Sequence, residues 1–215
     1  MLERATTKFG IENIQTESKV VLYLGFLVEQ RLPYKEVLGA FLRIISESRL
    51  KNAYLLIVGR QNEARYGERI MAENIISLAR KRGLDRNLGL VLLELSDEEK
   101  LKIIAESEVM FYPFTTSRLN PPVVDPPLAI LESMSSGKKV LSSAVLSAPE
   151  IINNGVNGFL LSQLDEESIS RALSRAIDCQ SDIGTNARDT ILKKFSLASV
   201  SRVLDNINEQ IVQMK

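Results

Sequence analysis

Short runs of hydrophobic residues alternate with amphipathic segments along most of the chain. The first run, Lys19–Gly25, is continuous and ends at a glycine, and a similar run covers Ala53–Gly59. Continuous apolar runs of this length are typical of parallel strands that are buried on both faces. The same reasoning predicts further strands at about 88–95, 109–112, 139–143 and 158–161.

The segments between these predicted strands have helical periodicity. Beyond Pro33, apolar side chains recur along one stripe, at Val37, Leu38, Phe41, Ile44 and Ile45. Further helices are predicted at about 64–82, 96–105, 128–136, 149–152 and 165–178, and two more between 185 and 214. Ser96 and Glu99 have the spacing of a capping box, and Asp165 is placed to cap the helix that follows it.

Strands that alternate with helices predict the α/β fold class. We expect a single Rossmann-like domain, a parallel six-stranded sheet with helices on both faces, and the strand order 3-2-1-4-5-6. Residues 1–18 are assigned to an N-terminal lead-in, 19–180 to the Rossmann-like domain and 181–215 to a C-terminal helical appendage.

Composition removes several classes of function. Lys and Arg number 27 and so do Asp and Glu, so there is no net basic charge to attract nucleic acid. The chain has no histidine, which excludes His-based triads and the common zinc sites, and we expect no metal and no cofactor. Its one cysteine, Cys179, cannot form an internal disulfide, and the N-terminus is too polar for a signal peptide. A cytoplasmic protein is expected.

Ligands of open parallel sheets bind beyond the carboxyl ends of the strands. The loops at such ends are Gly25–Lys35, Gly59–Asn62 and Phe114–Pro127. Neither a G-x-G-x-x-G fingerprint after the first strand nor a P-loop is present, which argues against a dinucleotide site and against a nucleoside triphosphatase.

The start of the helix after the third of these loops is a candidate anion site. Helix N-termini bind phosphate through free N–H groups, and here Leu128 and Ala129 would supply them because Pro126 and Pro127 have none. Alternatively, Asp125 is an ordinary N-cap and the prolines only start the helix. One turn further on, Glu132 either accepts both hydroxyls of a ribose or is a solvated helix glutamate.

Two motifs decide between these alternatives. Residues 131–141 read LESMSSGKKVL and residues 150–160 read EIINNGVNGFL. They resemble the signature of the retaining GT-B glycosyltransferases of family four, in which a helix ending L-E-A-M-A-x-G-x-P-V-I precedes E-x-I-x-x-G-x-x-G-x-L-V. The resemblance runs in order over nearly the whole chain, from YLGFLVEQ at the first strand to KKFSLASVSRVL near the end.

The resemblance implies one half of a GT-B fold, the C-terminal domain that binds a nucleotide-sugar donor. Glu132 matches the glutamate that holds the donor ribose in that family. Val124 stands where the family has a further glutamate, which contacts the donor sugar, and Phe26 stands where it has an arginine. No catalytic residue is assigned. The residues expected to bind the donor are Glu132, Asp125, Leu128, Ala129, Lys35, Arg31, Gly25 and Arg60, with Arg31 and Lys35 as alternatives for the cation at the phosphate.

The expected function is therefore donor binding in a retaining, hexosyltransferase-like sugar transfer. This transfer needs an acceptor-binding domain or subunit, through which the protein would also reach a membrane surface. The alternative is a degenerate, non-catalytic domain that serves protein association. A hydrophobic stripe in the last helix favours the alternative, because it could form a homodimer interface or bind a partner. The stripe could also simply pack on the chain's own core. Its residues are Leu197, Val200, Leu204, Ile207 and Ile211.

Overall fold

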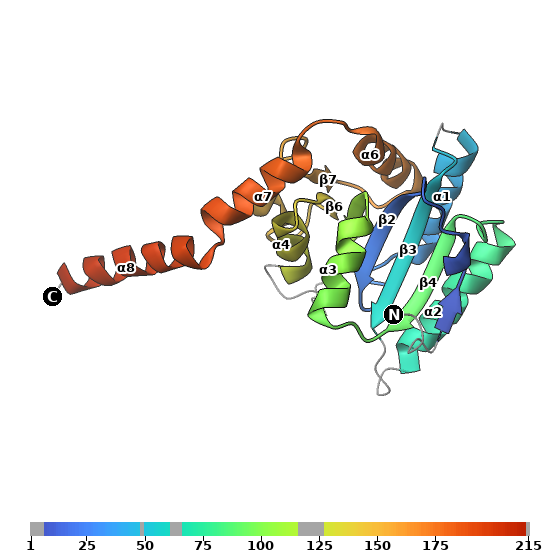
Figure 1. Cartoon of the computed structure of the whole chain (residues 1–215), viewed down its shortest axis with the longest axis horizontal. Helices are drawn as coiled ribbons and strands as arrows, with labels where there is room; N and C mark the ends of the chain where they lie inside the picture. Colours follow the sequence, from blue (N-terminus) through green and yellow to red (C-terminus); the bar gives the residue numbers. More distant parts are fainter. Residues whose placement is uncertain (1–6, 48–49, 61–65, 116–126, 214–215) are drawn as a thin grey trace.

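A seven-stranded sheet forms the centre of the part of the chain that the structure describes. The structure is a computed structural model, and it describes residues 7–47, 50–60, 66–115 and 127–213. The sheet has the order β1-β4-β3-β2-β5-β6-β7. Figure 1 shows β2, β3 and β4 side by side in its centre. Its strands are β1 (Thr7–Phe9), β2 (Lys19–Gly25), β3 (Ala53–Arg60), β4 (Leu88–Leu93), β5 (Val109–Tyr112), β6 (Lys139–Ser143) and β7 (Phe159–Leu161).

Strands β2 to β7 are parallel to one another, and their order confirms the predicted 3-2-1-4-5-6 arrangement. The predicted strand count was wrong by one. Residues 7–9, which the sequence analysis placed in a lead-in, form β1 and pair antiparallel with β4, so that Lys8 lies opposite Val91. Without β1, β4 would be an unpaired edge strand of the sheet. A short polar segment is enough to pair with such an edge in the antiparallel direction.

Helices cover both faces of the sheet, as expected. One face carries α1 (Tyr34–Glu47), α2 (Tyr66–Lys81) and α6 (Glu166–Asp178), and the other carries α3 (Asp97–Glu106), α4 (Leu128–Ser135) and α7 (Ile183–Lys194). Along β2 the side chains alternate between the two cores: Val21 and Tyr23 pack with α1, whereas Leu22 packs with α4. The remaining elements are η2 (Ile11–Asn13), α5 (Ala148–Ile151) and α8 (Leu197–Gln213).

Local sequence signals begin and end several of these helices. The capping box of α3 is present, with the Ser96 hydroxyl accepting from the Glu99 backbone N–H and the Glu99 carboxylate accepting from the Ser96 N–H. Asp165 caps α6 by accepting from the Ser168 N–H at 2.8 Å. Gly137 ends α4 in a left-handed conformation with φ 70°, which glycine adopts without strain.

The start of α4 differs from one alternative considered above. Its N-cap residue is Pro127, which has no side chain able to cap. Asp125 itself lies outside the described residues. The first helical N–H groups, those of Leu128 and Ala129, therefore begin the helix without a side-chain cap.

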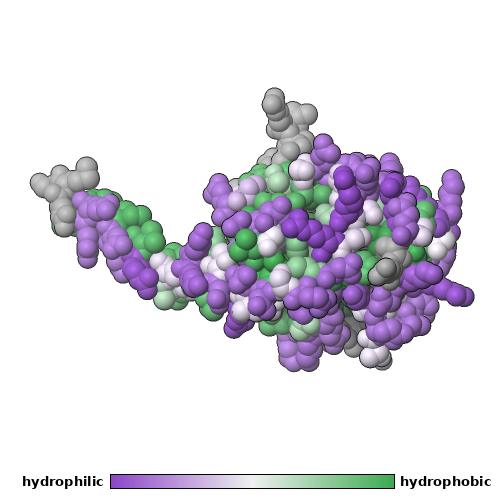
Figure 2. All heavy atoms as spheres, turned by 90° about the horizontal axis from the view of Figure 1, so that it is seen from above, coloured by the Kyte–Doolittle hydropathy of each residue, from purple (hydrophilic) through white to green (hydrophobic). Residues whose placement is uncertain are grey.

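The last helix, α8, projects away from the rest of the chain (Figure 1). Hydrophobic residues run along one side of it and hydrophilic residues along the other (Figure 2). Its predicted stripe is exposed, with Leu197 84% and Leu204 54% accessible, so the stripe does not pack on the core of this domain. Among the described helices, none is both long enough and apolar enough to cross a membrane.

Candidate functional site

A hollow of about 300 Å³ lies at the carboxyl ends of the central strands. It is bordered by Gly25 at the end of β2, Arg60 at the end of β3, Leu93 at the end of β4 and Tyr112 at the end of β5. The chain order of the strands reverses between β2 and β5. This reversal opens a crevice at the sheet edge, which is where open α/β sheets bind their ligands.

Buried polar groups hold the loop after β2 in place through hydrogen bonds to its backbone. The Tyr23 hydroxyl donates to the Phe26 carbonyl at 2.6 Å, and the Leu27 N–H donates to Oε2 of Glu68, a side chain that is only 3% exposed. Burial raises the pKa of the Tyr23 hydroxyl far above its ordinary value, so Tyr23 remains a hydrogen-bond donor at any physiological pH. The backbone at the mouth of the hollow is thereby fixed before any ligand arrives.

Two arginines approach the hollow around one aromatic ring. The guanidinium carbon of Arg31 lies 4.9 Å from the centroid of Phe26, and that of Arg60 lies 5.8 Å from it. Both distances are within the range of cation–π attraction. Arg31 comes from the loop after β2 and Arg60 from the end of β3, so two positive charges that are distant in sequence meet at the border of the hollow, beside Phe26.

A lysine and a glutamate that also border the hollow form an ion pair. Lys100 of α3 donates from Nζ to Oε1 of Glu132 of α4 at 2.8 Å. The Lys100 side chain is 25% exposed and that of Glu132 is 45% exposed, so the pair stands at the border between the hollow and solvent. Oε2 of Glu132 accepts no hydrogen bond from a residue in the described ranges, so it is available to a ligand.

The floor beside Glu132 is rigid. The Tyr112 hydroxyl is hydrogen-bonded to Oγ of Ser133 at 2.8 Å, and Ser133 in turn donates to the Ala129 carbonyl at 2.7 Å. Burial raises the pKa of Tyr112 well above its ordinary value, so this hydroxyl also stays protonated. The bonds tie the first turns of α4 to the end of β5, and they fix where Glu132 leaves the helix.

The structure brings together most of the residues that the sequence predicted for the site. Gly25, Arg31, Arg60, Ala129 and Glu132 all border the hollow. Of the two alternative cations, Arg31 lies there, whereas Lys35 is outside it and lies 3.8 Å from the Glu29 carboxylate. Leu128 is 64% exposed and does not line the hollow, and Asp125 is not among the described residues.

Sequence reasoning missed Lys100 and Asp97, which also border the hollow. Both lie in the first turns of α3, immediately after the capping box at Ser96. That capping box was recognised from the sequence, and it follows a strand that ends at the ligand edge. This combination was a signal that the start of α3 faces the site.

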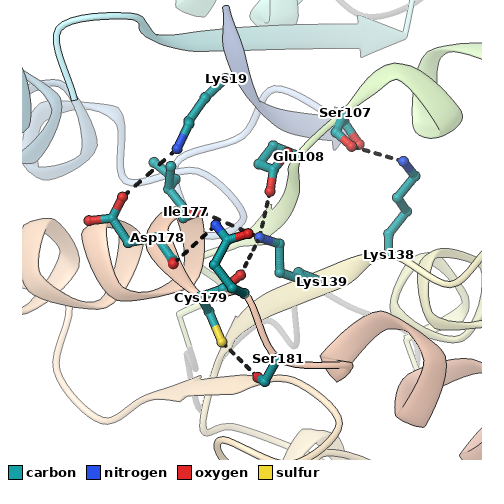
Figure 3. A network of polar contacts seen from close by, with 10 residues as sticks. Lys19, Ser107, Glu108, Lys138, Lys139, Ile177, Asp178, Cys179 and Ser181 are labelled. Atoms are coloured by element: carbon teal, nitrogen blue, oxygen red, sulfur yellow. Dashed lines mark hydrogen bonds and ion pairs between the residues drawn. The ribbon is translucent and has the colours of Figure 1, made fainter.

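A second polar cluster lies at the opposite edge of the sheet, where the strands begin (Figure 3). Lys139, the first residue of β6, pairs with Glu108 and donates to the Cys179 carbonyl at 3.1 Å, while Lys19 pairs with Asp178 at 3.9 Å. These contacts connect the end of α6 to three strands. Because the charges satisfy one another at the amino edge, the cluster has a structural role.

The part of the chain that the structure describes also contains a larger hollow, of about 620 Å³, between the residues before β7 and α7. Its polar groups are used internally: Asn157 donates to the Ile151 carbonyl and to Thr190, and Asn186 donates to the Val156 carbonyl. The smaller hollow is the better candidate for an anionic, hydroxylated ligand, because its arginines can pair with the anion and Glu132 can accept from the hydroxyls. Within the described ranges, no group of three His, Cys, Asp or Glu side chains is placed to hold a metal ion.

Comparison with known proteins gives a family model and several solved structures. The model described as "Glycosyl transferases group 1" matches residues 5–190. No curated protein matches the chain in sequence.

Among the solved structures, a glycosyltransferase from Rickettsia africae superposes with a TM-score of 0.71 at 16% identity, over 95% of this chain and 50% of that one. Anabaena HepE in complex with UDP and glucose has a TM-score of 0.70 at 16% identity, over 89% of this chain and 48% of that one. The C-terminal domain of a glycosyl transferase group 1 family protein (LpcC) from Francisella tularensis has a TM-score of 0.69 at 15% identity, over 86% of this chain and 90% of that domain. The chain thus spans about half the length of the first two structures and nearly all of the isolated domain.

Proposed function

Because the chain belongs to the glycosyl transferases of group 1, we propose that it is the donor-binding half of a glycosyltransferase and that the hollow binds the nucleoside diphosphate of a nucleotide sugar. One observation carries the proposal. A carboxylate with an available oxygen, Glu132, and two guanidinium groups, Arg31 and Arg60, border the same hollow at the carboxyl edge of the sheet. Ribose hydroxyls and phosphate oxygens require these two kinds of partner.

The ligand would lie across the hollow as follows. The ribose donates its hydroxyls to the Glu132 carboxylate, and the phosphates meet Arg31 and Arg60. The N–H groups at the start of α4 add the positive end of a helix dipole, with Ala129 the nearer of the two predicted donors. The base lies towards Leu93 and Leu95, which border the same hollow.

We further propose that the sugar transfer is of the retaining kind and needs a second, acceptor-binding domain or subunit. The motifs LESMSSGKKVL and EIINNGVNGFL support this, and so does the correspondence of the chain to about half the length of the first two solved structures. The exposed stripe of α8 is a candidate surface for that partner. Donor binding by this set of side chains requires no metal.

Nucleotide binding tests the proposal directly. HepE was solved with UDP, which makes UDP the first nucleotide to titrate, followed by GDP and ADP. We expect one of them to bind to the isolated chain in calorimetry, with modest affinity because half of the cleft is missing. If no nucleotide diphosphate or nucleotide sugar binds at millimolar concentration, the proposal fails and a role in protein association takes its place.

Glu132→Ala is the matching site variant. We expect it to weaken binding by about 1.5–3 kcal/mol, the range for hydrogen bonds to a charged group, with little change in Tm because the side chain is half-exposed. Lys102→Met is the control: Lys102 pairs with Glu98 on the outside of α3 and does not border the hollow. A large loss of stability with unchanged binding would identify Glu132 as a structural ion-pair partner instead.

A further inference from the structure

Lys100 connects two helices that are far apart in sequence. It lies in the first turns of α3, and its ammonium group reaches Glu132 in the middle of α4, 32 residues away. The N–O distance of 2.8 Å is that of a charge-assisted hydrogen bond. The contact is also part-buried, so solvent screens it less than a fully exposed pair.

The same helix offers a local ion pair for comparison. Lys102 also stands 2.8 Å from a carboxylate, that of Glu98, but the two residues are one turn apart on α3 and their side chains are 59% and 80% exposed. Such a pair contributes little and positions nothing outside its own helix. The Lys100–Glu132 pair, in contrast, sets the direction of a side chain that borders the hollow.

This direction matters for the chemistry proposed above. A glutamate has three rotatable side-chain bonds, and an unrestrained Glu132 would lose that freedom when it met a ligand. Lys100 engages only Oε1. Oε2 and the remaining lone pair of Oε1 can then accept two hydroxyl hydrogens, which is what the neighbouring 2′- and 3′-hydroxyls of a ribose donate.

We propose that Lys100 is a positioning residue that holds the Glu132 carboxylate for the ribose hydroxyls, and that this ion pair sets the preference of the site for ribonucleotides over deoxyribonucleotides. The inference rests on the proposed function, because it concerns the same hollow. The inference predicts that Lys100 affects the preference for a ribonucleotide, which a lysine that only attracts phosphate would not do. A phosphate-binding lysine would serve UDP and 2′-deoxy-UDP equally, whereas a residue that positions Glu132 affects the two nucleotides differently.

The test is a set of calorimetric titrations with UDP and 2′-deoxy-UDP. The wild-type chain, K100M, K100R and the control K102M are compared, with circular dichroism to confirm that each is folded. If the wild-type chain selects GDP or ADP, the corresponding ribo and deoxyribo pair is used.

We expect the wild-type chain and K102M to prefer the ribonucleotide by about tenfold or more, the ratio that one charge-assisted hydrogen bond supplies. K100M should lose most of this preference, chiefly through weaker binding of the ribonucleotide. K100R, which keeps a donor and the charge, should keep part of the preference.

The possible failures are distinguishable. If the wild-type chain binds no nucleotide at all, the proposed function fails and this inference fails with it. If the wild-type chain binds but K100M weakens both nucleotides by the same factor, Lys100 acts on the phosphates and the inference alone is overturned. An unchanged preference in K100M overturns it as well, and K100R provides the same comparison if K100M does not fold.

Discussion

At the scale of single residues, two buried tyrosines and one buried carboxylate hold groups that lie nearby. Tyr23 and Glu68 hold the loop after β2, and Tyr112 holds the start of α4 through Ser133. These side chains support the site by fixing the backbone around it, without any need to contact a ligand. Removing the Glu68 carboxylate would leave the N–H of the buried Leu27 without this hydrogen bond, which costs more than the bond itself contributes.

Cys179 allows a clean test at this scale, because it is the only cysteine in the chain. Its sulfur lies 2.9 Å from the Ser181 hydroxyl, and hydrogen bonding to Ser181 lowers the pKa of the thiol. We therefore expect the rate of alkylation by iodoacetamide to rise with pH through a midpoint below that of a free cysteine.

In Ser181→Ala this midpoint should move to higher pH, since the thiolate loses the hydrogen bond that stabilises it. Ser201→Ala, an exposed position on α8, is the control and should leave the midpoint unchanged. An identical midpoint in the wild-type chain and in Ser181→Ala would show that the hydroxyl does not stabilise the thiolate.

At the scale of elements, the site depends on how α3 and α4 begin. The capping box at Ser96 satisfies the first N–H groups of α3, the helix that carries Lys100. We expect Ser96→Ala to destabilise the chain by about 1 kcal/mol, as the loss of an N-cap does, measured by urea unfolding. Nucleotide binding should weaken as well, because the first turn of α3 then frays. Ser201→Ala again provides the comparison, and equal stability of the two variants would contradict this role of the cap.

The last helix tests the boundary of the folded unit. The stripe of α8 is exposed, so a chain that ends at Ser196 should have the Tm and the nucleotide affinity of the full chain. By contrast, Ile191→Ala on α7 removes a side chain that is 8% exposed and should cost about 2–5 kcal/mol. A marked fall in Tm on truncation would mean that α8 packs on the domain in solution.

Size-exclusion chromatography of the two chain lengths would show whether α8 joins two copies of the chain. The homodimer stays a prediction.

At the scale of the whole molecule, the described fold has one ligand edge and no facing domain within the described residues. We expect the isolated chain to fold and to bind donor, but to release sugar only by slow hydrolysis. Positioning an acceptor against the donor supplies about 7–11 kcal/mol of the reduction in the barrier, and this positioning needs a second surface. The assay follows release of nucleoside diphosphate from a panel of nucleotide sugars, with and without acceptors. Acceptor-dependent turnover by the chain alone would refute the proposal that it is half of an enzyme.

The sequence by itself determined the class of the fold and the order of six strands, whereas the ligand edge that it indicates stays a prediction. It did so because parallel strands buried on both faces give continuous apolar runs, and because helix caps such as Ser96 and Asp165 are local in sequence. The motif around Glu132 was likewise readable, since its residues are consecutive on one helix and its turn. The assignment of residues 1–18, 19–180 and 181–215 to separate regions remains a prediction, although β1 shows that part of the first region joins the sheet.

Only the tertiary structure decided which distant side chains share the site. β1 has too few residues to show a strand pattern, and it exists because β4 offers an edge. Arg31 rather than Lys35 borders the hollow: Lys35 is the second residue of α1, and its ammonium group lies 3.8 Å from the Glu29 carboxylate. The contact of Lys100 with Glu132 joins two helices on the same face of the sheet, and such a contact depends on how the two helices pack, which no local pattern encodes.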